Sequence, residues 1–182
     1  MNAPDDDYDG DDYGDGYDSD LDEAGSEALV WQLLLLINPG DEESALQQFA
    51  DYREALNEAG GETDEPIWLI KDAIDWKAGY YVDWKDSESF IDSINELAAR
   101  WNLRIDWGTD DTADPEFLDG TDIPALMATA HDRLREHGYT LWTWNTGGDS
   151  YAGWIALRRD DEGLQMLATA LGIEARPGSD AF

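Results

Sequence analysis

Cysteine is absent from the 182-residue chain. Disulfide bonds, thiolate metal sites and a cysteine nucleophile are therefore excluded, and a reducing compartment is the expected environment. Histidine is nearly absent: His131 and His137 lie six residues apart, so they would not share a helix face as zinc ligands at positions i and i+4 do. These shortages predict a protein that holds no metal and no other cofactor.

Basic residues are scarce as well. Eleven Lys and Arg residues stand against 43 Asp and Glu residues, which gives a net charge of −32. Proteins that bind nucleic acid need clustered Lys and Arg to displace counterions, and here only Arg158 and Arg159 adjoin. We therefore expect no direct binding to nucleic acid or to an anionic membrane. The charge favours a cationic protein partner, because opposite charges steer the encounter.

Long apolar segments are missing too. The longest run, residues 28–37, is too short to span a bilayer and instead predicts a buried helix. The N-terminus has neither the basic start nor the apolar core of a secretion signal. We therefore expect a cytoplasmic protein.

Acidic residues are what the chain has in excess, and they are densest at the N-terminus. Residues 1–27 contain 12 acidic residues and no basic residue, which predicts a disordered acidic tail over residues 1–26. Residues 5–10 begin like a calcium-binding loop, but Gly16 stands where the closing acid belongs. Residues 28–182 still carry a net charge of −20. We expect one acidic folded domain at residues 27–174 and a flexible C-terminus at residues 175–182.

Apolar periodicity divides the folded part into helices and strands. Helical spacing predicts three helices before residue 79 and further helices at residues 87–101, 122–137 and 164–171. Alternation predicts strands at residues 80–84, 103–107, 139–145 and 151–157, the last two joined by a Thr-Gly-Gly-Asp turn. This order implies an α+β fold, with a sheet of about four strands, a C-terminal hairpin, helices packed on the sheet, and two to three N-terminal helices.

The nine tryptophans are far more than a chain of this length usually has. Three of them end the pattern aliphatic-Asp-Trp, at residues 74–76, 82–84 and 105–107. On a strand this pattern places the indole and the aliphatic side chain on one face and the carboxylate on the other. The pattern fits packed indoles with solvated carboxylates, or a row of carboxylates along an exposed sheet face. Trp142 and Trp144 also share a face, which is either core or a binding surface.

These indoles and carboxylates supply the candidate binding site. Its predicted residues are Asp83, Trp84, Asp106, Trp107, Asp110, Asp111, Trp142, Trp144, Asp149 and Tyr151. No catalytic residue is assigned, because the second glycine near Ser150 comes one residue too late for a nucleophile elbow, and the segment lies in the predicted hairpin. The sequence therefore predicts binding rather than catalysis.

Four segments carry a family resemblance: INPGDEE, YYVDWKDSESF, LRIDWGTDD and GYTLWTWNTGGDSYAGWIAL. With these segments the chain resembles an uncharacterised family of small, acidic, Trp-rich bacterial proteins over about residues 30–172. The resemblance implies a bacterial, cytoplasmic protein and supplies no catalytic residue.

Three hypotheses of function fit these observations. The first is an acidic protein-binding module, either an immunity-type inhibitor or a mimic of nucleic-acid charge, that engages a cationic partner. The second is a small-molecule or carbohydrate-binding module, or a hydrolase, that uses tryptophan and carboxylates in a cleft. The third is a regulatory partner whose acidic tail contacts basic segments. The charge of the folded part favours the first hypothesis.

Overall fold

A four-stranded antiparallel sheet lies at the centre of the computed structural model, which describes residues 15–182, with side chains from residue 25 onward. The strand order is β1-β3-β2-β4. The strands are β1 (Gly79–Asp83), β2 (Tyr139–Trp144), β3 (Ser150–Leu157) and β4 (Ala175–Pro177). Strands β2 and β3 form the predicted hairpin, in which Trp142 lies opposite Trp154.

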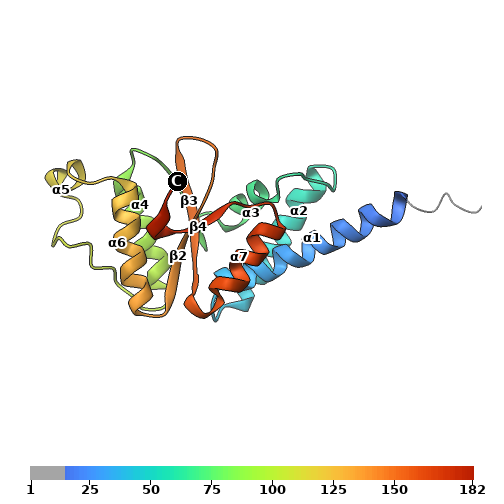
Figure 1. Cartoon of the computed structure of the whole chain (residues 1–182), viewed down its shortest axis with the longest axis horizontal. Coiled ribbons are helices and arrows are strands. Elements are labelled where there is room, and N and C mark those ends of the chain that lie inside the picture. Colours follow the sequence, from blue (N-terminus) through green and yellow to red (C-terminus); the bar gives the residue numbers. More distant parts are fainter. Residues whose placement is uncertain (1–14) are drawn as a thin grey trace, which may run out of the picture.

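Helices cover both faces of the sheet (Figure 1). One face carries α4 (Ser87–Ala99) and α6 (Ile123–Glu136). The other face carries α1 (Asp15–Ile37), α2 (Glu42–Glu58), α3 (Pro66–Ile74) and α7 (Asp161–Ala170). Short elements complete the chain: α5 (Pro115–Asp119) and the 3-10 turns η1 (Arg158–Asp160) and η2 (Gly178–Asp180). The predicted α+β fold, with three N-terminal helices and helices packed on the sheet, is confirmed.

The sheet separates two hydrophobic cores. Alternation along β3 directs Trp154 and Ala156 into the core under α1, and Ile155 into the core under α6. Because helices cover each face, β2 and β3 are buried along almost their whole length. An exposed sheet face lined by carboxylates is therefore not formed.

Gly153 allows β1 and β2 to flank β3 closely. A Cβ atom at this position would collide with the Trp142 carbonyl and would lie 2.7 Å from the Tyr80 hydroxyl. Tyr80 lies opposite Gly153 in the register, and its hydroxyl donates to the Trp142 carbonyl at 3.0 Å. The ring of Tyr80 thus covers the glycine and links β1 to β2 across β3.

Aspartates begin four of the helices. A side-chain oxygen of each accepts a backbone N–H in the first turn, as the N-caps Asp41 of α2, Asp86 of α4, Asp114 of α5 and Asp122 of α6. Such caps satisfy donors that have no partner within the helix. Part of the acidity is therefore structural.

The predicted strand at residues 103–107 is not a strand. The segment is an extended connection after α4, and its alternation arises because Ile105 and Trp107 are buried on the core under α6. The indole N–H of Trp107 donates to Asn95 at 3.0 Å. An extended segment that lies on the surface of a core buries every second residue, as an edge strand does, so the two cannot be distinguished by alternation alone.

The C-terminal residues form the fourth strand in place of the predicted flexible segment. Residues 175–177 pair with residues 142–144 of β2, and Gly178 is buried beside Met127 and Leu141. Three residues are too short for an alternation pattern, and Pro177 argues against a strand in sequence, although an edge strand accommodates it.

The N-terminus also differs from its prediction. Residues 15–26 of the predicted tail belong to α1, because extending a helix that the buried segment 28–37 already forms costs less than starting one. Residues 1–14 of that tail lie outside the described residues. In the part of the chain that the structure describes, no helix has the length and apolarity needed to cross a membrane.

Candidate functional site

The structure brings five of the ten predicted site residues to one end of the sheet, at the β2–β3 turn. Trp84, Trp144, Asp149 and Tyr151 line one hollow of about 250 Å³. Asp83 ends β1 directly before Trp84, whose backbone N–H donates to the Asp149 carbonyl at 2.9 Å. The end of β1 and the hairpin turn therefore form a single surface.

Four other predicted residues lie apart, in the connection between α4 and α5. Asp106 accepts the Gly108 N–H and lies 3.9 Å from Arg133, while Asp111 accepts the Ala113 N–H. Asp110 is exposed and Trp107 is buried. No cluster of three Asp, Glu or His side chains suited to a metal ion occurs among the described residues. The carboxylates of Asp106 and Asp111 fix local turns.

Trp142 and Trp144 share a face, as predicted, but helices cover that face. Both are buried, with 3% and 2% of their surface exposed. Trp142 lies in the core opposite Trp154. Trp144 packs edge-on against Trp68 with ring centroids 5.4 Å apart, and part of it lines the hollow at the hairpin. Only Trp144 of this pair can therefore contact a ligand.

Two further hollows continue from this one. Their volumes are about 380 Å³ under α1 and 270 Å³ beside α3. The first and second share Asp64, Pro66 and Leu171, and the second and third share Trp144, Asn145 and Thr146. We call this continuous surface the acidic groove. Its acidic lining residues are Glu27, Glu62, Asp64, Glu65, Asp149 and Glu174, and no Lys or Arg lines it.

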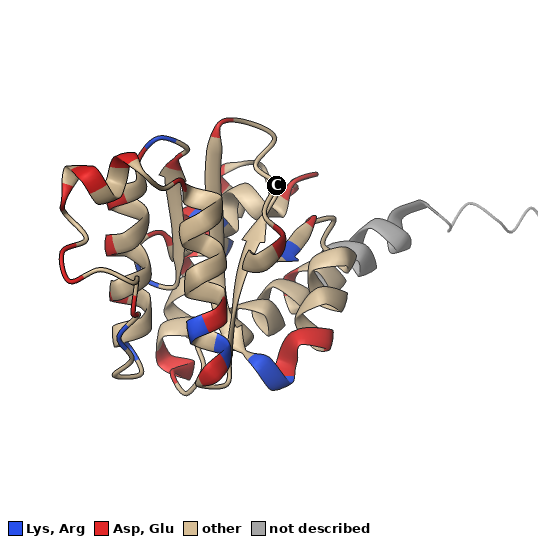
Figure 2. Cartoon of the chain, turned by 60° about the vertical axis from the view of Figure 1, so that its left-hand side comes forward, with Lys and Arg blue, Asp and Glu red and all other residues tan. Residues whose placement is uncertain are grey.

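Most of this negative charge has no nearby counter-charge. Glu27 lies 3.7 Å from Arg53 and Glu174 lies 3.2 Å from Arg176. The other four carboxylates have no Lys or Arg within 4.0 Å in the described part of the chain. Figure 2 shows the same excess over the molecule, with Asp and Glu far outnumbering Lys and Arg. Within the described chain, four of the six carboxylates that line the groove are thus not engaged in an ion pair.

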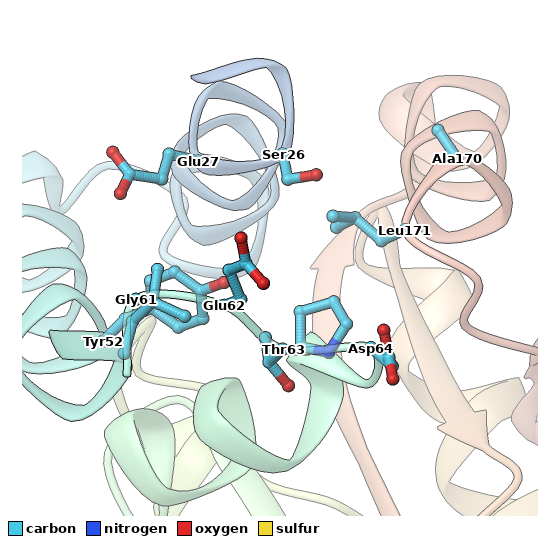
Figure 3. Close-up of a pocket in the computed structure, with 11 residues that line it drawn as sticks. Ser26, Glu27, Tyr52, Gly61, Glu62, Thr63, Asp64, Ala170 and Leu171 are labelled. Carbon is cyan, nitrogen blue, oxygen red and sulfur yellow. The ribbon is translucent and has the colours of Figure 1, made fainter. Parts of the chain in front are cut away.

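The first hollow is shaped by the end of α2. Gly60 and Gly61 adopt φ angles of 99° and 86°, and their N–H groups donate to the carbonyls of Asn57 and Leu56. This C-terminal cap reverses the chain and places the residues after it under α1. Figure 3 shows the Glu62 carboxylate pointing toward α1, where Ser26 and Glu27 lie. Carboxylates from two elements therefore border one hollow.

Tyr52 of α2 contributes the buried wall of this hollow. Only 1% of its surface is exposed, and its hydroxyl has no hydrogen-bond partner among the described residues. Figure 3 shows that hydroxyl directed into the hollow. Burial, followed by the nearby charge of Glu27, raises the pKa of Tyr52, so the hydroxyl stays protonated and neutral. It offers lone pairs to a donor that enters the hollow.

The third hollow, at the hairpin, is preorganised by its own turn. Asn145 accepts the Gly147 N–H at 2.9 Å, and the Thr146 hydroxyl donates to the Ser150 carbonyl at 2.8 Å. The carboxylate of Asp149 takes no part in this network. Half of the Trp84 side-chain surface is exposed beside it.

Sequence reasoning missed the parts of the groove under α1 and beside α3, namely Glu27, Tyr52, Glu62, Asp64, Trp68 and Glu174. One signal was present: a Gly-Gly helix stop followed by three acids before Pro66. Which helix that acidic turn faces depends on tertiary packing, which no local pattern records.

Comparisons with known proteins identify a family and no function. Neither the search of curated proteins nor the search of solved structures found a match. A family model described as a domain of unknown function (DUF6630) matches residues 29–178, which include the whole sheet and most of the acidic groove. The match confirms the resemblance to an uncharacterised family and extends it through β4. The chain therefore belongs to the DUF6630 family.

Proposed function

We propose that this protein is a binding module that captures a cationic segment of another protein in the acidic groove. The observation that carries the proposal is the lining of the groove, where four carboxylates lack a basic neighbour and no Lys or Arg is present. A positive segment entering the groove would gain Coulomb energy without displacing an internal ion pair at these four positions. Complementary charge would also speed the encounter and select against acidic partners.

The aromatic residues favour a cation over a neutral sugar as the ligand of the groove. A sugar-binding platform needs an open indole face, but Trp144 is buried and packs edge-on against Trp68. Trp84 is the exposed indole at the groove, and Lys85 Nζ already lies 4.9 Å from its ring centroid. The position of Lys85 indicates that this indole face favours a positive group, and a partner's cation would replace Lys85 there.

The specific form of the proposal is an inhibitor of the immunity type, or a mimic of nucleic-acid charge, acting in the cytoplasm. A protein that binds phosphate must present a basic face. An acidic groove on a rigid domain, with indoles beside it, can cover such a face and exclude the phosphate backbone.

The test is the affinity of a decapeptide of alternating Gly and Lys for the full chain, measured by calorimetry. The double variant Glu62→Gln/Asp64→Asn should weaken binding about tenfold, because each partly exposed charge pair contributes ~0.5–1 kcal/mol. Affinity should also fall as NaCl rises.

The matched control is Glu116→Gln/Asp119→Asn, which removes the same charge from exposed residues of α5, outside the groove. It should change the affinity less than about twofold. If both variants weaken binding equally, the groove is not the site, and if the peptide does not bind at all, the proposed function is wrong.

A further inference from the structure

We propose that the hollow under α1 is a subsite for a primary ammonium group, which is the head of a lysine side chain in the captured segment. This inference rests on the proposed function and adds a specificity to one part of the acidic groove. Its starting point is the Tyr52 hydroxyl, a polar group on a side chain that is 99% buried, directed into the hollow and without a partner among the described residues (Figure 3).

Acceptors reach this hollow from three elements. Ser26 and Glu27 come from α1, Tyr52 comes from α2, and Glu62 with Asp64 comes from the connection between α2 and α3. A lysine ammonium carries three N–H donors that diverge from one nitrogen, so it needs acceptors in several directions. Hydroxyl and carboxylate side chains from these three elements line the hollow, which has a volume of about 380 Å³.

A guanidinium group fits this hollow less well. Its planar fork is recognised by a carboxylate that accepts two parallel N–H bonds and by an aromatic face on which it stacks. The aromatic residue here is Tyr52, which directs its hydroxyl rather than its ring face into the hollow (Figure 3). The hairpin hollow is instead lined by two aromatic residues, Trp84 and Tyr151, beside the carboxylate of Asp149.

An inorganic cation is a poorer occupant than an ammonium. The described side chains, including those of this hollow, form no group of three or more Asp, Glu or His set to hold a metal ion. Hydroxyl donors and acceptors such as Tyr52 and Ser26 suit an ammonium because its N–H groups make directional hydrogen bonds. The hollow also adjoins the rest of the groove, with which it shares Asp64, Pro66 and Leu171, as a side chain projecting from an extended segment requires.

One basic residue of the chain itself competes at the rim. Arg53 Nε lies 3.7 Å from Glu27 Oε2, with both side chains partly exposed. Arg53 does not line the hollow, and Glu62 and Asp64 remain without a basic neighbour within 4.0 Å in the described chain. The variant Arg53→Gln should therefore strengthen lysine binding about two- to threefold, by removing a competing positive charge.

The experiment compares four probes on the full chain by calorimetry: decapeptides of Gly alternating with Lys, with Arg, or with Nε-acetyl-lysine, and free spermidine. The native protein should bind the Lys peptide at least about fivefold more tightly than the Arg peptide, and the acetylated peptide should lose most of its affinity. Spermidine should bind more weakly than the Lys peptide, because it cannot occupy the groove as an extended chain.

Two variants locate this preference. Tyr52→Phe and, independently, the exposed Glu62→Gln should each remove most of the preference for Lys, and Tyr52→Phe should leave the affinity for the Arg peptide nearly unchanged. Tyr139→Phe, whose ring stacks on Trp101 away from the groove, should leave the Lys-to-Arg ratio unchanged. Glu62→Gln keeps the test decisive if Tyr52→Phe fails to fold.

The outcomes separate the two proposals. If both peptides bind equally and neither variant changes the ratio, the ammonium subsite is wrong while the groove proposal stands. If spermidine binds as tightly as the Lys peptide, the ligand of the subsite is a free polyamine rather than a lysine side chain of a polypeptide, and the inference is wrong. If no cationic peptide binds, the proposed function itself is wrong.

Discussion

Individual buried residues show how this acidic chain keeps its core neutral. His131 on α6 is buried, and neither ring nitrogen has a hydrogen-bond partner among the described residues. Burial first, and then the positive charge of Arg135, lowers its pKa, while Asp132 and Asp161 oppose the shift. The fold therefore disfavours the charged form of the imidazole.

The sign of this shift predicts a pH dependence of stability. Because the pKa of His131 is lower in the fold than in the unfolded chain, its contribution is complete above about pH 6.5 and is lost as the pH falls below that value. In urea unfolding at about pH 7.5 and 5.5, His131→Leu should lose less stability on acidification than the native chain does. The exposed His137→Gln is the control and should follow the native chain. Equal slopes for all three would contradict a neutral, buried His131.

The glycine at the centre of the sheet gives a second residue-scale prediction. Gly153→Ala should lower the free energy of unfolding by about 3 kcal/mol, because its methyl group would collide with the Trp142 carbonyl and crowd the Tyr80 hydroxyl. Gly148→Ala, in open space, should change stability by less than about 0.5 kcal/mol. Chemical denaturation measures both, and a tolerated Gly153→Ala would show that the register is not as described.

At the scale of elements, several acidic residues begin helices as N-caps. The Asp122 side chain accepts the Ala125 N–H at 2.9 Å and caps α6. At the other end of the sheet, Arg100 extends from the end of α4 to the α1–α2 turn, 3.4 Å from the Ile37 carbonyl. Burial lowers the pKa of Arg100 to about 10, which still leaves it charged at neutral pH. Polar side chains thus link the two helical layers around the sheet.

The cap of α6 is directly testable. Asp122→Ala should cost about 1 kcal/mol of stability, because the first turn of α6 loses its side-chain acceptor. Asp119→Ala removes the same charge at an exposed residue whose side chain caps no helix, so it should stay within about 0.5 kcal/mol of the native value. Urea unfolding distinguishes the two, and equal losses would assign the effect to charge rather than to capping.

The elements that sequence predicts correctly are those with strong local signals. Helical spacing locates the helices near residues 87–101 and 122–137, and the Thr-Gly-Gly-Asp turn locates the hairpin. Strand β4 could not be predicted, because its three residues are extended by pairing with β2 rather than by their own pattern. Residues 103–107 show the converse. Their apolar and polar residues alternate because one side of the segment lies on the core, although the segment pairs with no strand.

The candidate site was predictable only at the hairpin, where Trp84, Asp149 and Tyr151 do lie together. The hollow under α1 joins residues more than a hundred positions apart in sequence, from Ser26 to Leu171. Only the packing of α1, α2 and α7 on one sheet face brings them together, and helix periodicity does not specify which helices become neighbours.

At the scale of the whole molecule, charge is the dominant property. Residues 25–182 hold 32 acidic and 11 basic residues, and seven of those acids lie within 4.0 Å of Lys or Arg. Such an excess repels itself in the compact state, and salt screens that repulsion.

The thermal midpoint should therefore rise by a few degrees when NaCl increases from about 10 to 300 mM. Differential scanning calorimetry of the full chain measures this, with KCl as a control that should give the same rise. A constant or falling midpoint would mean that the carboxylates are compensated within the fold.

The most direct measurement of the central claim is the map of backbone amide chemical shifts when the alternating Gly-Lys decapeptide is titrated into the isotopically labelled full chain. The acidic groove predicts shifts confined to the residues that line it, at 26–27, 52, 61–68, 84, 144–151 and 170–174. Shifts centred instead on the acidic connection at residues 106–122, or spread evenly over all acidic surfaces, would contradict it.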